Sequence, residues 1–230
     1  AFQTGKRPEL AVWYEAAAGG MTTSRAYARE APPWLLELAR AWPSKRFADQ
    51  TWEPLDAALL ARATGLPDDA PGEGGVHGLD TTFPHSLATV DDVGRALIHT
   101  PYADELVMDA ALAAITAMHL GADEVPDLLA ISFNAHDYAG HLWGPQSWEI
   151  LDLTLRLDAA IGRLFETLDR RLGRNGWAVV LTSDHGMTPV VEQSKLVGAR
   201  RIKSDDIAST IDAELERFGP GPWVAKVASG

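Results

Sequence analysis

Two short segments of the chain place aspartate beside histidine in patterns that suit metal binding. Asp137 and His141 are separated by three residues, and Asp184 is followed directly by His185. A carboxylate and a neutral imidazole are good ligands for zinc, which accepts oxygen and nitrogen donors and keeps a position open at catalytic sites. Two such ions about 3.5–4 Å apart clamp the attacking and leaving oxygens of a displacement at phosphorus. The four residues therefore predict about half of a two-metal site for phosphate ester chemistry.

Each pair alone also has an ordinary explanation. A lone Asp-x-x-x-His is a metal site in roughly one case in ten, because short motifs match by chance, and the adjacent pair is hardly more specific. The combination is more informative, because each pair follows an apolar run that predicts a buried strand. His136 is the closest rival as a ligand, and we expect it to support Asp137 or to face solvent. The remaining histidines fit ordinary loop or helix positions: His77, His85, His99 and His119.

The elements around the two pairs predict an α/β domain. Residues 127–133 and 177–181 are short apolar runs typical of strands. Between them, residues 147–172 carry apolar side chains at alternating spacings of three and four, which predicts a long amphipathic helix. Strand, helix and strand in this order indicate a parallel sheet, and open α/β sheets bind ligands at the carboxyl ends of their strands. Both pairs should therefore meet at one edge of the sheet.

The residues around each pair also bear on whether its backbone forms a helix, a loop or a turn. On a helix, Asp137 and His141 would share a face, but glycine and proline over residues 134–146 favour a folded loop. Asp184 and His185 can bind together only where the backbone turns sharply, and Gly186 supplies that freedom. Either geometry allows the side chains to converge on an ion.

The rest of the chain predicts further helices and one irregular excursion. Helices are expected over residues 34–42, 54–64 and 104–120, and from Ser204 to just before Gly219. Residues 66–90 are rich in glycine and proline and lack periodicity, so they predict an irregular, cap-like insertion. The apolar run 223–227 is typical of a strand.

The composition bounds the class of protein. With 230 residues, 46% of them hydrophobic, the chain is long enough for one large domain, residues 1–230. A net charge of −12 argues against a nucleic-acid partner, and the absence of cysteine excludes disulfides and thiolate ligands. The most apolar stretch, residues 106–122, contains Asp109 and His119 and is too polar to span a bilayer. No leader segment is recognisable, and the oligomeric state stays open.

The sequence that flanks the four residues resembles a known family. Residues 137–149 and 181–187 resemble the two metal segments of type I phosphodiesterases and nucleotide pyrophosphatases, members of the alkaline phosphatase superfamily. The resemblance includes Asp158 and residues 126–129. Upstream, the chain is similar to PafA-type alkaline phosphatases, which are monoesterases with a threonine nucleophile, at residues 11–14, 20–24, 33–34 and 51–52.

This resemblance implies a three-layer α/β/α fold with a mostly parallel sheet and two zinc ions. Asp137 and His141 would hold one zinc, and Asp184 and His185 the other. It further implies that the nucleophilic threonine lies outside the chain. Residues 1–230 would then be a partial catalytic domain, truncated at both ends and inactive by itself.

The implied function is metal-dependent hydrolysis of small-molecule phosphate esters, in first place monoesters, by a longer periplasmic or secreted enzyme. A nucleotide pyrophosphatase or phosphodiesterase is the first alternative, since it shares all four ligands. A folded but non-catalytic domain that lacks the nucleophile is the alternative from a different class.

Overall fold

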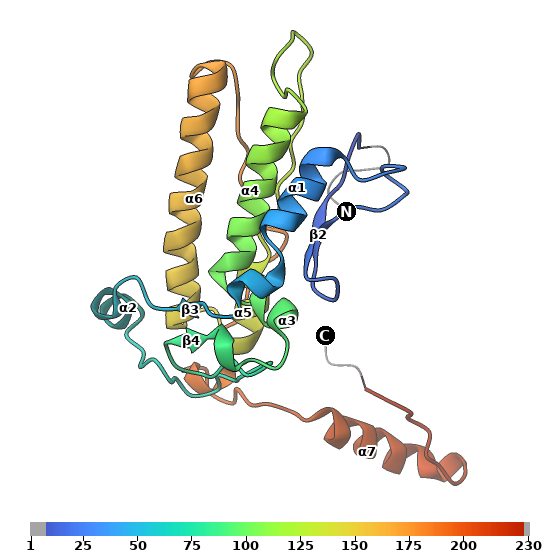
Figure 1. The fold of residues 1–230 in the computed structure, drawn as a ribbon. Helices are drawn as coiled ribbons and strands as arrows, with labels where there is room; N and C mark the ends of the chain where they lie inside the picture. Colours follow the sequence, from blue (N-terminus) through green and yellow to red (C-terminus); the bar gives the residue numbers. More distant parts are fainter. Residues whose placement is uncertain (1–7, 228–230) are drawn as a thin grey trace. The chain divides into compact units, whose positions relative to one another are not determined.

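The computed structural model describes residues 8–227 and divides the chain into two compact units, Ala1–Pro189 and Val190–Gly230. The first unit is mainly helical (Figure 1). Its helices are α1 (Pro33–Ala41), α2 (Ala57–Thr64), α3 (Val93–Leu97), α4 (Pro101–Ala117), α5 (Ala135–Trp143) and α6 (Trp148–Leu172), with 3-10 turns η2 (Ser44–Phe47) and η3 (Leu87–Thr89). Its strands are β1 (Trp13–Glu15), β2 (Gly20–Thr22), β3 (Thr51–Trp52) and β4 (His85–Ser86).

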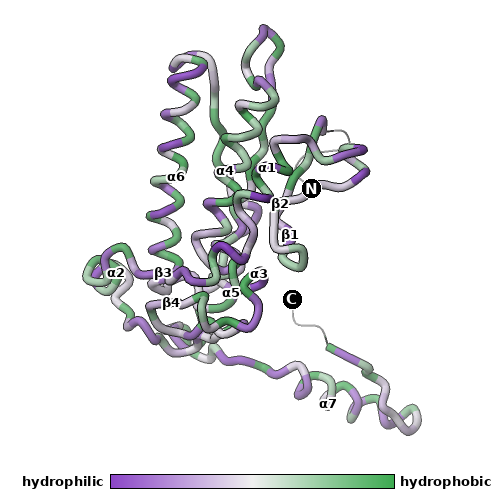
Figure 2. Tube along the Cα trace, in the orientation of Figure 1, coloured by the Kyte–Doolittle hydropathy of each residue, from purple (hydrophilic) through white to green (hydrophobic). Residues whose placement is uncertain are grey.

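The two long helices, α4 and α6, run side by side and pack on one another (Figure 1). Helix α6 begins where the Ser147 hydroxyl accepts a hydrogen bond from the Ile150 amide at 3.2 Å, and it ends before Gly173. Its polar and apolar residues alternate along the helix, whereas α4 is apolar over most of its length (Figure 2). The contact is made by Met108 and Ile115 of α4 with Ala160 and Leu164 of α6. The predicted helix 147–172 is thus confirmed to within one residue.

The main core lies at the opposite end of this helix pair, around two indole rings. Trp52 and Trp143 are 1% and 0% exposed, and their ring centroids are 5.9 Å apart in an edge-to-face arrangement. Leu97, Leu106 and Leu153 complete the same buried cluster. Helix α5 and the beginning of α6 are therefore fixed by aromatic packing.

Strand pairing in the described residues is limited to two short antiparallel ladders. Strand β1 pairs with β2 in the register Tyr14 with Met21, and β3 pairs with β4 in the register Trp52 with His85. No parallel pair occurs within residues 8–227. The α/β class holds, but the parallel sheet stays a prediction.

Three local predictions differ from what the structure shows. Residues 127–133 and 177–181 form no ladder in the described part of the chain, and Leu128, Val180 and Leu181 are 94%, 91% and 81% exposed. Residues 134–146 are not a loop, because α5 occupies most of them and ends at Gly144, whose φ is 90°.

The third difference concerns the second unit, which contains η4 (Val191–Gln193), α7 (Ser204–Leu215) and η5 (Glu216–Phe218). No strand forms over residues 223–227. Instead, the amides of Trp223 and Val224 donate to Asp212 Oδ1 at 2.8 and 2.9 Å, which folds this segment back onto α7. Because a side chain satisfies these amides, they need no ladder partner.

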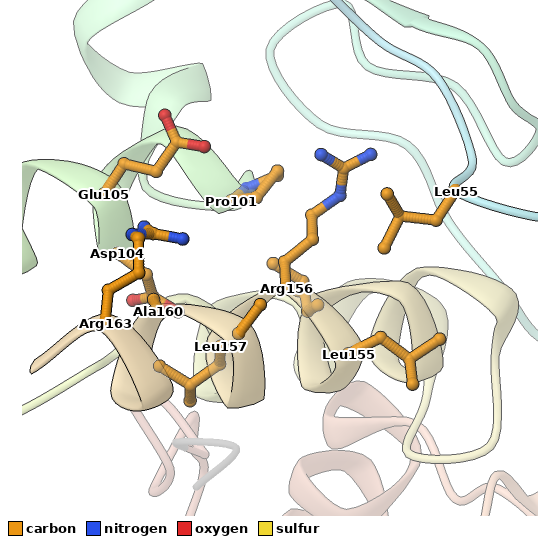
Figure 3. Close-up of a pocket in the computed structure, with 11 residues that line it drawn as sticks. Leu55, Pro101, Asp104, Glu105, Leu155, Arg156, Leu157, Ala160 and Arg163 are labelled. Atoms are coloured by element: carbon orange, nitrogen blue, oxygen red, sulfur yellow. The ribbon is translucent and has the colours of Figure 1, made fainter. Parts of the chain in front are cut away.

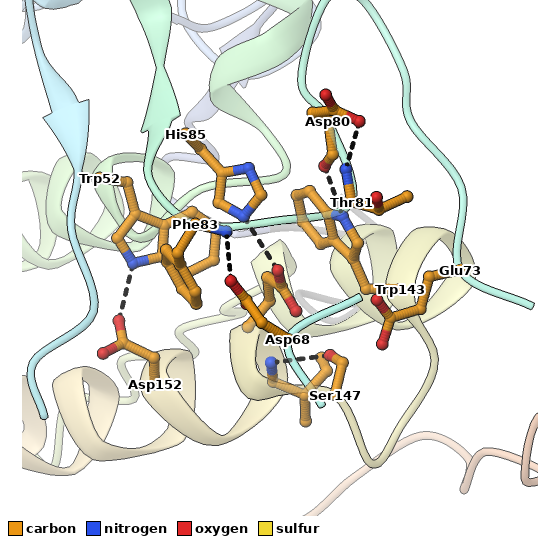
Figure 4. A network of polar contacts seen from close by, with 12 residues as sticks. Trp52, Asp68, Glu73, Asp80, Thr81, Phe83, His85, Trp143, Ser147 and Asp152 are labelled. Atoms are coloured by element: carbon orange, nitrogen blue, oxygen red, sulfur yellow. Dashed lines mark hydrogen bonds and ion pairs between the residues drawn. The ribbon is translucent and has the colours of Figure 1, made fainter. Parts of the chain in front are cut away.

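Residues 66–90 are irregular apart from β4 and η3, and side-chain hydrogen bonds fix them to α5 and α6 (Figure 4). The Trp143 indole donates to the carbonyl of Asp80 at 2.9 Å, and the Trp148 indole donates to the carbonyl of Leu66 at 2.9 Å. His85 Nε2 lies 2.9 Å from Glu149 Oε1, and both side chains are fully buried. This excursion is a packed part of the unit.

No helix in the described part of the chain combines the length and apolar character needed to cross a membrane.

The excursion makes stability depend on pH through Glu73. Burial raises the pKa of Glu73 to about 8, the amide of Ala70 opposes the shift, and the carboxylates of Glu149, Asp69 and Asp68 add to it. The folded state thus holds a proton that the unfolded chain releases above its ordinary pKa of 4.5, so stability falls as pH rises from about 4.5 to about 8. We expect Glu73→Gln to melt above the wild type at about pH 9, with a smaller difference at about pH 5.

Thermal unfolding across this pH range measures the effect. Glu124→Gln, at an exposed site between helices, is the matched control and should follow the wild type at every pH. Parallel melting curves for wild type and Glu73→Gln at all pH values would contradict the assignment.

Candidate metal centre

Helix α5 presents Asp137 and His141 one turn apart on the same face. Asp137 Oδ1 lies 3.5 Å from His141 Nε2. The helix is anchored at its beginning by a buried side chain from α4, since Asp104 Oδ1 accepts from the amide of Ala135 at 3.3 Å. It is anchored at its end by the Trp143 indole, so the two residues sit on an element with little freedom to move.

The second pair lies in a tight turn that fixes the histidine tautomer. The amide of His185 donates to Asp184 Oδ1 at 3.0 Å, and the hydroxyl of Ser183 donates to the carbonyl of His185. His185 Nδ1 lies 3.0 Å from the carbonyl of Gly186. A carbonyl can only accept, so Nδ1 must carry the proton, and in the neutral ring Nε2 is left with a free lone pair for a metal.

The two segments meet at Asp137. Its Oδ1 lies 3.4 Å from His185 Nε2 as well as 3.5 Å from His141 Nε2, and Asp184 Oδ2 lies 3.9 Å from the same His185 nitrogen. The structure therefore brings together all four residues that the sequence indicates, with Asp137 between the two imidazoles. Asp184 is the most exposed of the four at 88%.

Protons compete with a cation for this site. The hydrogen bond to the Gly186 carbonyl raises the pKa of His185, and the charges of Asp184 and Asp137 raise it further. In the protonated ring Nε2 also carries a proton, and a cation that binds Nε2 must displace it. Cation binding should therefore release protons and weaken as pH falls.

The donor set fits zinc in kind. Asp137 Oδ1 is buried and has no hydrogen-bond donor, although two imidazole nitrogens face it, which is the environment of a carboxylate oxygen that needs a cation. Nitrogen and oxygen donors without sulfur are common at catalytic zinc sites. However, no group of three or more such side chains within residues 8–227 has the geometry to hold an ion alone.

A supporting carboxylate, Asp104, was not identified from the sequence. It is 5% exposed, burial raises its pKa to about 7, and its Oδ2 has no hydrogen-bond donor. His136 Nδ1 lies 3.9 Å from this oxygen. On its other side, His136 Nε2 lies 3.1 Å from the hydroxyl of Thr154, which itself donates to the carbonyl of Ile150. His136 must therefore donate from Nε2, and it links α5 to α6 in a supporting position.

A cavity that the site does not share lies elsewhere in the unit (Figure 3). It has a volume of about 170 Å³ and is lined by Leu55 and by side chains of α4 and α6, among them Asp104, Arg156 and Arg163. It includes none of the four aspartate and histidine residues. The guanidinium of Arg156 donates to Asp152 at 2.6 Å and to the carbonyl of Glu53 at 2.7 Å, so it is held in place by the protein itself.

Comparison with known proteins identifies the family of the chain. A model of the type I phosphodiesterase / nucleotide pyrophosphatase family matches residues 10–225. Alkaline phosphatase PafA of Elizabethkingia meningoseptica is 31% identical over 185 residues, which cover 79% of this chain and 34% of that protein. Alkaline phosphatase PhoV of Synechococcus elongatus is 32% identical over 195 residues, which cover 83% of this chain and 35% of that protein.

A solved structure is similar as well. The crystal structure of wild-type alkaline phosphatase PafA superposes with a TM-score of 0.79 at 27% identity, covering 92% of this chain and 41% of that one. The chain thus spans about a third of the length of the curated relatives it matches. Its α/β fold and its relatives define it as a member of the alkaline phosphatase superfamily. Within that superfamily it belongs to the type I phosphodiesterase / nucleotide pyrophosphatase family and resembles the PafA-type enzymes.

Asp104 should matter as a hydrogen-bond acceptor for α5. We expect Asp104→Ala to lower the free energy of unfolding by about 1–2 kcal/mol, because the amide of Ala135 loses its partner inside the core. Asp104→Asn keeps an acceptor oxygen and should lose much less. Chemical denaturation at neutral pH measures both variants.

Asp158→Ala, at an exposed position on α6, is the control and should change stability by less than about 0.5 kcal/mol. Equal losses in Asp104→Ala and Asp104→Asn would show that the charge of Asp104, rather than its acceptor oxygen, stabilises the helix.

Proposed function

We propose that this chain supplies part of the metal centre of a zinc-dependent phosphate ester hydrolase whose preferred substrates are phosphate monoesters. The observation that carries the proposal is the position of Asp137 Oδ1, buried, without a donor, and within 3.5 Å of imidazole nitrogens from two separate segments. Membership of a phosphodiesterase and pyrophosphatase family supports phosphate ester hydrolysis as the reaction.

The proposal gives each of the four residues a role. Asp137 and His141 hold one ion, and Asp184 and His185 hold the other. Zinc at such a pair of positions supplies a Lewis acid for the phosphoryl oxygens and lowers the pKa of bound water. The Gly186 carbonyl fixes His185 in the tautomer that leaves Nε2 unprotonated, and α5 keeps Asp137 and His141 in register. The nucleophile in this proposal is a threonine outside residues 1–230.

The finer features of the fold belong to the same proposal. The apolar segments 127–133 and 177–181 would be neighbouring parallel strands in the middle layer of an α/β/α sandwich. Their exposed side chains, Leu128, Val180 and Leu181, support this arrangement, since strands of a covered parallel sheet are apolar on both faces. By the same family resemblance, the enzyme would act in the periplasm or outside the cell.

A diesterase is the second candidate, because the family description names phosphodiesterases and nucleotide pyrophosphatases and these share the four proposed ligands. Similarity to the alkaline phosphatases PafA and PhoV over about four-fifths of the chain favours the monoesterase. We expect the full-length protein to hydrolyse p-nitrophenyl phosphate with a higher kcat/KM than bis(p-nitrophenyl) phosphate. A ratio below one would move the assignment to the diesterase.

Substitution of the central ligand tests the metal site itself. In the full-length protein, Asp137→Asn should reduce zinc-dependent hydrolysis of p-nitrophenyl phosphate by at least about 100-fold and lower the zinc content, because a neutral amide is a much weaker ligand than a carboxylate. Asp158→Asn, on the exposed face of α6, is the control and should retain both. Wild-type zinc content and turnover in Asp137→Asn would overturn the assignment.

A further inference from the structure

The two segments that carry the proposed metal ligands touch through a glycine and a methionine, neither of which is itself a proposed ligand. Gly140 lies in α5 directly before His141, and Met187 lies two residues after His185. A Cβ atom placed on Gly140 would overlap both Cε and Sδ of Met187, and it would also lie 3.7 Å from Ile150 Cδ1. The methionine thus occupies the space that any larger residue at position 140 would fill.

The glycine is not explained by backbone geometry. Gly140 is buried inside a regular helix and is not among the residues with positive φ in the described chain. Alanine at such a position would favour the helix by about 1 kcal/mol. The absence of a side chain therefore costs helix stability, and the terminal Sδ and Cε atoms of Met187 fill the space that it leaves open.

The contact spans the same two segments as the Asp137 to His185 approach of 3.4 Å. The turn that carries Asp184 and His185 is otherwise held mainly by hydrogen bonds within itself, from Ser183, His185 and Gly186. These local bonds shape the turn but do not fix its distance from α5. The partly buried Met187 side chain lies on α5, and this apolar contact links the turn to the helix, so it can set that distance.

We propose that Met187, seated on Gly140, is a positioning residue that sets the separation between the proposed ligand pairs of α5 and the 184–185 turn. This inference rests on the proposed metal function. Met187 touches neither ion nor substrate in this role. It acts by holding His185 Nε2 within reach of Asp137, so its loss should change how zinc is held as well as how stable the protein is.

A double-mutant cycle in the full-length protein tests the proposal with Gly140→Ala, Met187→Ala and their combination. The readouts are zinc affinity by competition with a chromogenic chelator and the d–d absorption spectrum after cobalt substitution. We expect Gly140→Ala to weaken zinc binding by at least about tenfold and to alter the cobalt spectrum, because the new methyl group displaces the Met187 side chain from its seat on α5. In the double variant the methyl group has room, so zinc affinity should return to the level of Met187→Ala or better.

Two controls separate positioning from ordinary packing. Gly162→Ala also removes a glycine from a helix, but the added Cβ meets nothing within 4 Å. It should raise the melting temperature by about 2–4 °C without changing zinc affinity or the cobalt spectrum. Met187→Leu keeps the apolar volume and should bind zinc as the wild type does.

The outcomes distinguish this inference from the function on which it rests. A wild-type protein that binds zinc, combined with additive effects in the cycle or unchanged affinity in Gly140→Ala, would overturn the positioning role alone. A melting-temperature loss without a change in zinc affinity or spectrum would do the same. A wild-type protein that fails to bind zinc would overturn the proposed function, and the positioning role with it.

Discussion

The structure of the first unit depends on two carboxylates buried near the beginning of α6. Glu149 and Asp152 are both 0% exposed, and buried charges of this kind are tolerated only with close partners. Asp152 accepts from the Trp52 indole at 2.7 Å and from Arg156 at 2.6 Å, while Glu149 faces His85 at 2.9 Å. Because Trp52 and His85 are paired across β3 and β4, the two acids attach the whole β3–β4 ladder to α6.

The same attachment reaches the candidate site through α5. The excursion of residues 66–90 lies against this helix, where the amide of Gly74 donates to the carbonyl of Leu142 at 3.0 Å and the Trp143 indole donates to Asp80. Asp104 fixes the opposite end of α5 from α4. The two proposed ligands on this short helix are thus held by two separate parts of the chain, the excursion and α4, which gives the site rigidity that nine helical residues alone would not provide.

The sequence predicts those features that depend on residues close together in the chain. The spacing of apolar residues located α6, and the residue types of the two pairs identified the positions that the fold brings together. Glycine at position 140 favours a loop, but residue 140 is helical, since α5 is anchored at both ends by Asp104 and Trp143. The role of Asp104 could not be predicted, since an acid in the first turn of a helix usually reflects the helix dipole. Strand pairing over residues 127–133 and 177–181 depends on partners distant in sequence, so apolar runs alone could not establish it.

The exposed run from Val179 to Leu181 bears on aggregation of the chain during its synthesis. Short uncharged segments of high β-propensity are templates for pairing between chains, and natural sequences flank them with charged residues that discourage aggregation. Here the flanking charges are Arg174 on one side and Asp184 on the other. A carboxylate that is 88% exposed repels neighbouring copies before any ion neutralises it. Asp184 therefore places an exposed negative charge at the end of an exposed apolar run, which is the arrangement by which charged residues discourage pairing between chains.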